Sequence, residues 1–122
     1  MTTVFDPMEF VVGWVAGVLE APAYTYVPDG PPDLFAVVTR TGGEVAYPHD
    51  SPEFAVQAWA RTDADAETAA YLVAIAATNP ASQPADRHCN AVGTPTMYSY
   101  GREDGGWYVW QVTVPLEFNL ID

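Results

Sequence analysis

The sequence predicts an α+β fold: a mostly antiparallel sheet of about five strands with two helices packed on one face. Two segments repeat apolar residues at helical spacing, and several shorter runs alternate apolar with polar residues, as half-buried strands do. Short Gly- and Pro-rich turns separate these runs, which favours antiparallel neighbours. The expected order is α-β-β-β-α-β-β, within one domain over residues 1–122.

A first helix is predicted at residues 7–20. Asp6 is a good N-cap, Pro7 suits the first helical position, and Glu9 has the spacing of a capping box. Pro22 disfavours helical geometry at the residue before it, so the helix should end there. The apolar residues at helical spacing are Val11, Trp14, Val15, Val18 and Leu19.

Three strands are expected next, at Tyr24–Val27, Leu34–Thr41 and Glu53–Ala60. The turn cluster at residues 28–32 separates the first two strands. The stretch Glu44–Pro52 has two prolines, and we interpret it as a loop.

A second helix is predicted from Thr62, its N-cap, to Ala77, before Asn79-Pro80. Its stripe of alanines favours close approach to a sheet. The last strands are expected at His88–Val92, Thr96–Tyr100 and Trp107–Val114. Pro115 indicates that the last of them has an edge position or a bulge. Residues 116–122 either continue that strand or follow it as a tail.

The charge is strongly negative. The chain has 16 acidic residues and 4 basic ones, all arginine, for a net charge of −12. This balance argues against binding nucleic acid by phosphate neutralisation and against an anionic membrane surface. Cys89 is the single cysteine, so no intrachain disulfide is possible, which fits a reducing compartment such as a bacterial cytoplasm. We expect neither a signal peptide nor a membrane span.

The residues suited to catalysis or metal binding are few. His49, His88 and Cys89 show no CxxC, HxH or HExxH spacing. Adjacent His88 and Cys89 would point to opposite faces of a strand. The acids Asp63, Asp65 and Glu67 are better explained as complements of the helix dipole than as ligands. We therefore expect no catalytic residue, no cofactor, no metal and no enzymatic activity.

Aromatic and arginine side chains are the more informative candidates. Trp59 and Trp107 fall on the strand faces opposite their apolar neighbours, so each is either partly covered by a loop or helix or placed in a subunit interface. In a chain this poor in cations, each arginine should find a carboxylate partner, within or between subunits. The candidate assembly interface is Arg40, Trp59, Arg61, Arg102 and Trp107.

Two segments resemble the tail terminator proteins of long, non-contractile-tailed bacteriophages, most of all those of actinobacterial phages and prophages. The matching parts, followed by an Ala-rich helix, are Pro22–Tyr24, Val27–Pro28, Pro32, Phe35–Gly43 and Asp50–Ala60. The resemblance covers roughly residues 9–78, and the strand at 107–118 matches in kind. Terminators commonly have an Arg-Tyr pair leading into the last strand. Here Trp107-Tyr108 stands there and Arg102 lies earlier, which leaves the role of Arg102 open.

The resemblance implies a structural virion protein, located in the tail or neck and assembled in the bacterial host cytoplasm. Such terminators form a hexameric ring on the last ring of the tail-tube protein, stop its polymerisation and present a surface to the head–tail connector. Double-stranded DNA passes through without specific binding, and an acidic lumen would keep the duplex from sticking. Gly42–Pro52 and Gly101–Gly106 are the expected lumen or interface loops.

Three other functions are compatible with parts of this pattern. A head–tail connector or tail-completion protein shares the size and the ring, and differs in its partner. An acidic DNA mimic would array carboxylates along one face, whereas the acids here are predicted in loops and at helix starts. A small hydrolase or isomerase would need a pocket with perturbed titratable groups, and the sequence does not indicate one.

Overall fold

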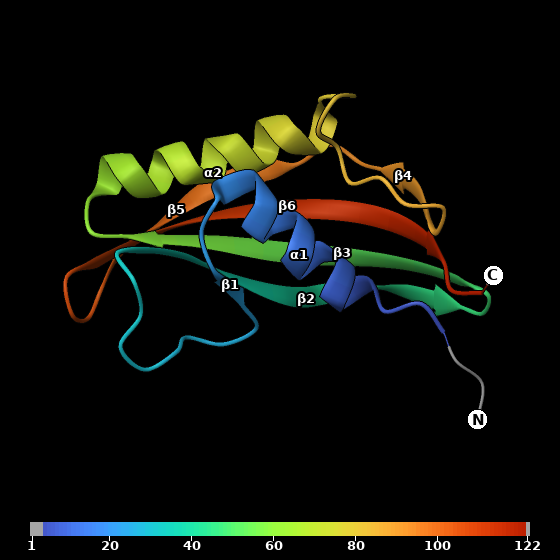
Figure 1. Cartoon of the computed structure of the whole chain (residues 1–122), viewed down its shortest axis with the longest axis horizontal. Helices are drawn as coiled ribbons and strands as arrows, with labels where there is room; N and C mark the ends of the chain where they lie inside the picture. Colours follow the sequence, from blue (N-terminus) through green and yellow to red (C-terminus); the bar gives the residue numbers. More distant parts are fainter. Residues whose placement is uncertain (1–3, 122) are drawn as a thin grey trace.

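The computed structural model describes residues 4–121, so residues 1–3 and 122 of the predicted domain lie outside the described residues (Figure 1). The described chain has the α+β architecture that the sequence predicts. Its elements are α1 (Pro7–Leu19), β1 (Ala23–Tyr24), β2 (Leu34–Ala46), β3 (His49–Ala60), α2 (Asp63–Thr78), β4 (Cys89–Val92), β5 (Thr96–Glu103) and β6 (Trp107–Asn119).

The sheet is mostly antiparallel, as expected, but one parallel pair makes it mixed, and it has six strands where about five were expected. Its order is β1-β2-β3-β6-β4, and β5 also pairs with β6, on the part of β6 that β4 leaves free. The parallel pair is β1 with β2, because the chain crosses between them through residues 25–33 instead of a tight hairpin. The remaining ladders are antiparallel.

Both helices begin where the sequence places their caps. The carboxylate of Asp6 accepts a hydrogen bond from the Glu9 amide at 3.2 Å, and the Thr62 hydroxyl accepts one from the Asp65 amide at 3.1 Å. Helix α1 ends one residue earlier than expected, because Glu20 takes the left-handed conformation (φ 51°) of a C-cap.

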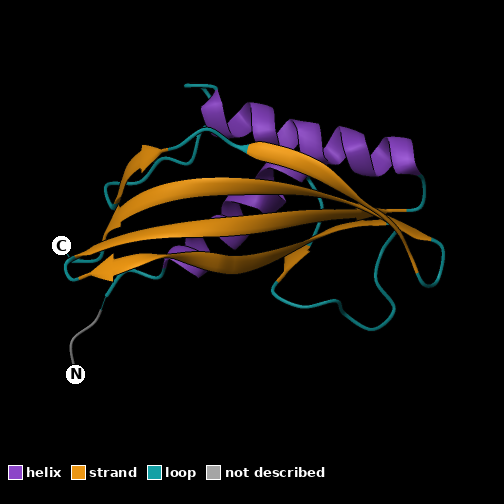
Figure 2. Cartoon of the chain, turned by 180° about the vertical axis from the view of Figure 1, so that it is seen from behind, coloured by secondary structure: helices purple, strands orange, loops and turns teal. Residues whose placement is uncertain are grey.

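Both helices lie on the same face of the sheet, which we call the helix face. In Figure 2, seen from behind, the strands pass in front of α1. The core between helices and sheet is almost entirely aliphatic and aromatic. The buried strand residues are Ala36, Val38, Phe54, Val56, Ala58, Val112, Val114, Leu116 and Phe118, and the helices add Val11, Val15, Leu19, Ala69, Ala70, Val73 and Ala77.

The stretch predicted as the loop Glu44–Pro52 is instead the end of a long hairpin, so the expected lumen or interface loop Gly42–Pro52 is a pair of strands joined by a tight turn. The β2–β3 ladder runs on to the pair Ala46 and His49. Gly43 makes this possible: it pairs with Pro52, and a Cβ on Gly43 would overlap the carbonyl oxygen of Ser51. Only glycine allows so close an approach, and its φ of 103° also suits glycine.

Pro115 lies inside β6, a strand paired on both sides, which corrects the expected edge position or bulge. It faces Glu53 of β3, and β6 continues past it to Asn119. On the other side of β6, β5 pairs as far as Thr113 and β4 begins at Leu116. Pro115 has no N–H to donate, and on this side it lies in the gap between β5 and β4, where no ladder hydrogen bond is lost. Its carbonyl accepts a hydrogen bond from the Gly93 amide at 2.8 Å.

Candidate functional site

The face of the sheet opposite the helices is the candidate site, and we call it the open face (Figure 2). By strand alternation it presents the residues between those of the helix-face core. Its side chains over the middle of the sheet are aromatic, aliphatic or uncharged polar. They include Phe35, Val37, Gln57, Trp59, Tyr98, Tyr100, Trp107 and Gln111.

A chain of side-chain hydrogen bonds crosses three strands of the open face. The Trp59 indole donates to Gln57 at 3.2 Å, and the Gln57 amide donates to Gln111 at 3.3 Å. The Gln111 amide donates to the Tyr98 hydroxyl, which lies 3.3 Å from the Tyr100 hydroxyl. Gln111 is only 4% exposed although no helix covers this face. The chain satisfies polar groups that the neighbouring rings shield from water.

The two tyrosines at the end of this chain reach solvent. Tyr98 is 44% exposed and Tyr100 is 47% exposed, and their rings meet edge to face. The pKa of Tyr98 is raised, first because its hydroxyl bonds to Tyr100 and then because burial disfavours the charged form. Tyr98 therefore stays neutral at physiological pH, and the two side chains offer ring edges and hydroxyls to a contacting surface.

An aromatic cluster occupies one end of the open face. Phe35 stacks on Trp59 with centroids 5.5 Å apart, and Trp107 meets Phe35 edge-on at 5.1 Å. Tyr24, from β1, closes over Phe35 at 6.1 Å. The Arg61 guanidinium lies 3.7 Å from the centre of the Trp107 ring.

The structure brings three of the five predicted interface residues together: Trp59, Arg61 and Trp107. Trp107 is only 7% exposed, so it is covered within the single chain, as the first of the two expected alternatives has it. Trp59 is half-buried. Arg61 also donates to the Gly105 carbonyl at 2.7 Å and lies 3.6 Å from the exposed Asp33 carboxylate.

The other two predicted residues lie apart from this cluster. Arg40 has its carboxylate within the chain, through two 2.8 Å hydrogen bonds to Asp50, which is 4% exposed. Arg40 also donates to the carbonyls of Gly42 and Gly43, so it stabilises the backbone where the outer part of the β2–β3 hairpin begins. The hydrogen bond to Asp50 raises the pKa of Arg40. Arg102 is exposed, with its guanidinium 6.0 Å from the Tyr108 ring centre.

Sequence reasoning missed Gln57, Gln111, Tyr98 and Tyr100. Tyr98 and Tyr100 carry a weak signal, because their spacing of two residues puts them on one side of a strand. The glutamines carry none, because they meet only through the register that sets Gln57 opposite Gln111 and Gln111 opposite Tyr98.

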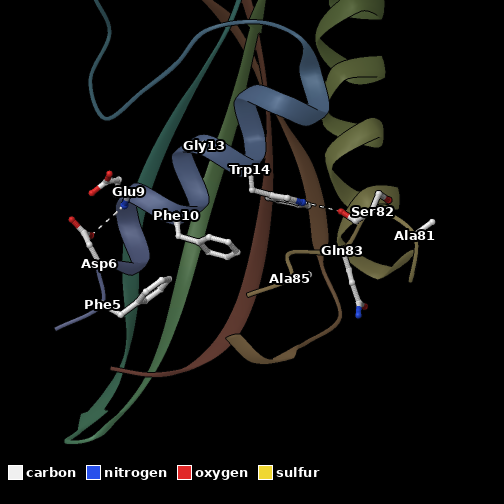
Figure 3. A pocket seen from close by; sticks show the side chains of 10 residues that line it. All are labelled: Phe5, Asp6, Glu9, Phe10, Gly13, Trp14, Ala81, Ser82, Gln83 and Ala85. Atoms are coloured by element: carbon white, nitrogen blue, oxygen red, sulfur yellow. Dashed lines mark hydrogen bonds between the residues drawn. The ribbon is translucent and has the colours of Figure 1, made fainter. Parts of the chain in front are cut away.

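An open pocket of 710 Å³ lies between the start of α1 and the segment after α2 (Figure 3). The rings of Phe10 and Trp14 point from α1 toward this segment, and the Trp14 indole donates to the Ser82 carbonyl at 2.9 Å. Asp6 and Glu9 are the charged residues of its described lining, and the Asp6 carboxylate is already engaged as the cap of α1. The pocket offers aromatic surface and negative charge, without a paired acid and base.

The candidate metal and nucleophile residues are dispersed. His88 stacks on Phe5 at 4.4 Å and its Nδ1 lies 2.7 Å from the Asn119 carbonyl. Burial raises the pKa of the Cys89 thiol. Asp63 accepts from the Trp110 indole at 2.9 Å. Within residues 4–121, no group of three or more His, Cys, Asp or Glu side chains is arranged to hold a metal ion.

In the part of the chain that the structure describes, no helix has the length and apolar character needed to cross a membrane. No family model matches the chain, and no curated protein matches it.

Proposed function

We propose that the chain is a ring-forming structural protein of the phage tail terminator type, with the strands running along the ring axis, the helices outside and the open face lining the bore. It ends tail-tube polymerisation at one rim of the ring and meets the head–tail connector at the other. Double-stranded DNA passes through the ring without being bound.

The one-sided covering of the sheet is the observation that supports this function best. A long sheet with helices on one face leaves the other face free to line a channel. The middle of the open face carries Gln57, Gln111, Tyr98 and Tyr100, with no arginine among them. Without cations, this middle part of the face does not bind phosphate by counterion release, so a duplex slides past it.

Both ends of the strand axis carry exposed apolar side chains, as a part placed between two partners needs. Tyr26 and Val27 are 64% and 50% exposed at the end where residues 25–33 form a loop. Val45 and Tyr47 are each 63% exposed at the tip of the β2–β3 hairpin, at the opposite end (Figure 1). Exposed apolar residues at a rim are typical of protein contacts.

The decisive experiment is electron microscopy of tail-tube protein assembled with and without this chain. We expect rings of this protein at one end of the tubes and an arrest of tube growth. Tyr26→Ser and Tyr47→Ser form a matched pair, because each removes one exposed tyrosine from one end of the molecule. We expect one variant to lose tube arrest and the other to keep it.

Thr68→Ala, on the outer side of α2, is the control and should leave arrest unchanged. Tubes that grow to unlimited length beside the wild-type chain would refute the terminator. Binding to a connector ring without any effect on tubes would instead identify the neighbouring neck protein.

A further inference from the structure

The sheet has two long free edges. At one edge, β1 pairs only with Ala36 and Val37, so no strand of the described chain lies outside the stretch Thr39–Ala46, the free part of β2. At the other edge, β5 pairs with β6 alone. β5 has 8 residues, and the free part of β2 is equally long.

These edges have little of the protection that a monomeric sheet needs. Neither stretch contains proline, and each carries only two charged residues, Arg40 with Glu44 and Arg102 with Glu103, as guards against strand addition. Each has one irregularity, between Arg40 and Gly42 and between Ser99 and Gly101. Arg40 occupies the carbonyls of Gly42 and Gly43, but each carbonyl keeps a second lone pair.

We propose that the free part of β2 of one copy pairs with β5 of the next copy, so that the copies join head to tail through a continuous sheet. β2 and β5 run in opposite directions, because the β2–β3, β3–β6 and β6–β5 ladders are all antiparallel. Rotation about an axis along the strands therefore presents them as an antiparallel pair. The two edges differ, and repetition of such a heterologous contact gives a ring when the rotation between copies closes. This inference rests on the proposed function.

The register of the sheet fits closure. The ladders place Thr96 level with Thr113, Ala55 and Thr39. The bulge between Arg40 and Gly42 places Glu44 opposite Ser51, four residues along β3 from Ala55. Pairing Thr96 with Glu44 of the next copy therefore requires a shift of about four residues, or about 13 Å. The four strands β2, β3, β6 and β5 span about 19 Å at about 4.8 Å each. The shift then corresponds to a strand tilt of about 35°, at the lower end of the range of about 35–45° for closed barrels.

A ring of this kind would be an open channel. With the six copies that the resemblance implies, four strands per copy give about 24 strands, and barrels of about 16–18 strands already enclose water. The bulky helices must then lie outside, which agrees with an inward open face.

Disulfide trapping tests the edge contact directly. In a Cys89→Ala background, Glu44→Cys puts a thiol on the free part of β2, and Thr96→Cys puts one on β5. Both positions are exposed and on the open face, opposite Ser51 and Thr113 respectively. On mild oxidation, a chain with both cysteines should give a ladder of covalent oligomers. A mixture of the two single-cysteine chains should give mainly the mixed dimer.

Thr68→Cys on α2 is the matched control and should not join the ladder. A mixed dimer no more abundant than each same-variant dimer overturns head-to-tail pairing. Rings seen by native mass spectrometry without the 44–96 crosslink overturn the edge contact while leaving the ring intact. A ladder in a protein that does not arrest tubes supports the edge contact and refutes the terminator function.

An edge-blocking variant gives a second test that does not depend on disulfide geometry. Thr96→Lys with Ser99→Lys places two charges along β5, the usual natural protection of an edge. We expect the ring to be lost while the melting temperature of the chain, measured by circular dichroism, stays within a few degrees. Retention of the ring in this folded variant overturns the proposal.

Discussion

The two faces of the sheet bury their residues by different means. The helix face is closed to solvent: alanine and valine side chains of the two helices pack against Phe54, Val56 and their aliphatic neighbours. The open face has no helix, yet Phe35 is 0% exposed and Gln111 only 4% exposed, because rings and amides from neighbouring strands cover one another. Stability is thus concentrated on one face, and the other is left for contact with something outside the chain.

The largest effect should come from a pair of phenylalanines, one on each face. Phe54 is 1% exposed under the helices and Phe35 is 0% exposed on the open face. Phe54→Ala should lower the free energy of unfolding by about 4–5 kcal/mol, because the closed core cannot collapse around the cavity. Phe35→Ala should cost less, about 3 kcal/mol, because the half-buried Trp59 and Tyr24 beside it can move inward.

Urea unfolding followed by circular dichroism measures both free energies, with Val4→Ala, an exposed residue, as the control. An equal or larger loss for Phe35→Ala would mean that the open face is as rigid as the core, and the comparison would fail.

The second effect concerns the hydrogen-bond chain of the open face. Gln111→Leu should lower the free energy of unfolding by about 1–2 kcal/mol, because it leaves the Gln57 amide without its partner. Adding Gln57→Leu should restore part of that loss, since it removes the unsatisfied Gln57 amide; the restoration is only partial because the Trp59 indole then loses its acceptor. The free energies of unfolding of the two single variants and the double variant are measured by denaturant unfolding. If the loss in the double variant equals the sum of the two single losses, the amides do not act as a pair.

How far the sequence predicts these faces depends on whether the signal is local. Asp6, Pro7 and Thr62 locate both helix starts, because capping involves residues three apart. The hairpin end was missed, because the prolines at 48 and 52 favour a loop and only pairing with Gly43 reveals a strand. The parallel pairing of β1 was missed for the same reason: a strand was predicted there, but its partner Ala36 lies beyond a turn cluster. The Gln57–Gln111–Tyr98 contacts depend on register, which spacing along the chain does not encode.

A third, smaller effect concerns the cation at the end of the open face. Arg61 covers the Trp107 ring at 3.7 Å, and a partly exposed contact of this kind contributes about 0.5–1 kcal/mol. Arg61→Ala should reduce stability by that amount and make Trp107 more accessible to acrylamide quenching. Arg102→Ala is the matched control, because its guanidinium lies 6.0 Å from the Tyr108 ring. Equal quenching of both variants would mean that Arg61 does not shield the cluster.

The smallest effect is a pH dependence that belongs to the open face. The folded-state pKa of Tyr98 is raised, mainly by the hydrogen bond to Tyr100, so the native state holds this proton more tightly than the unfolded chain. The stabilisation is therefore complete below the ordinary tyrosine pKa of about 10, and it is lost as the pH rises through the folded-state pKa.

Tyr98→Phe removes the titrating group, so the difference in melting temperature between wild type and variant should narrow above about pH 10. If the difference stays constant, or grows with pH, the two hydroxyls do not share a proton in the folded chain, and the tyrosines are independent contact residues.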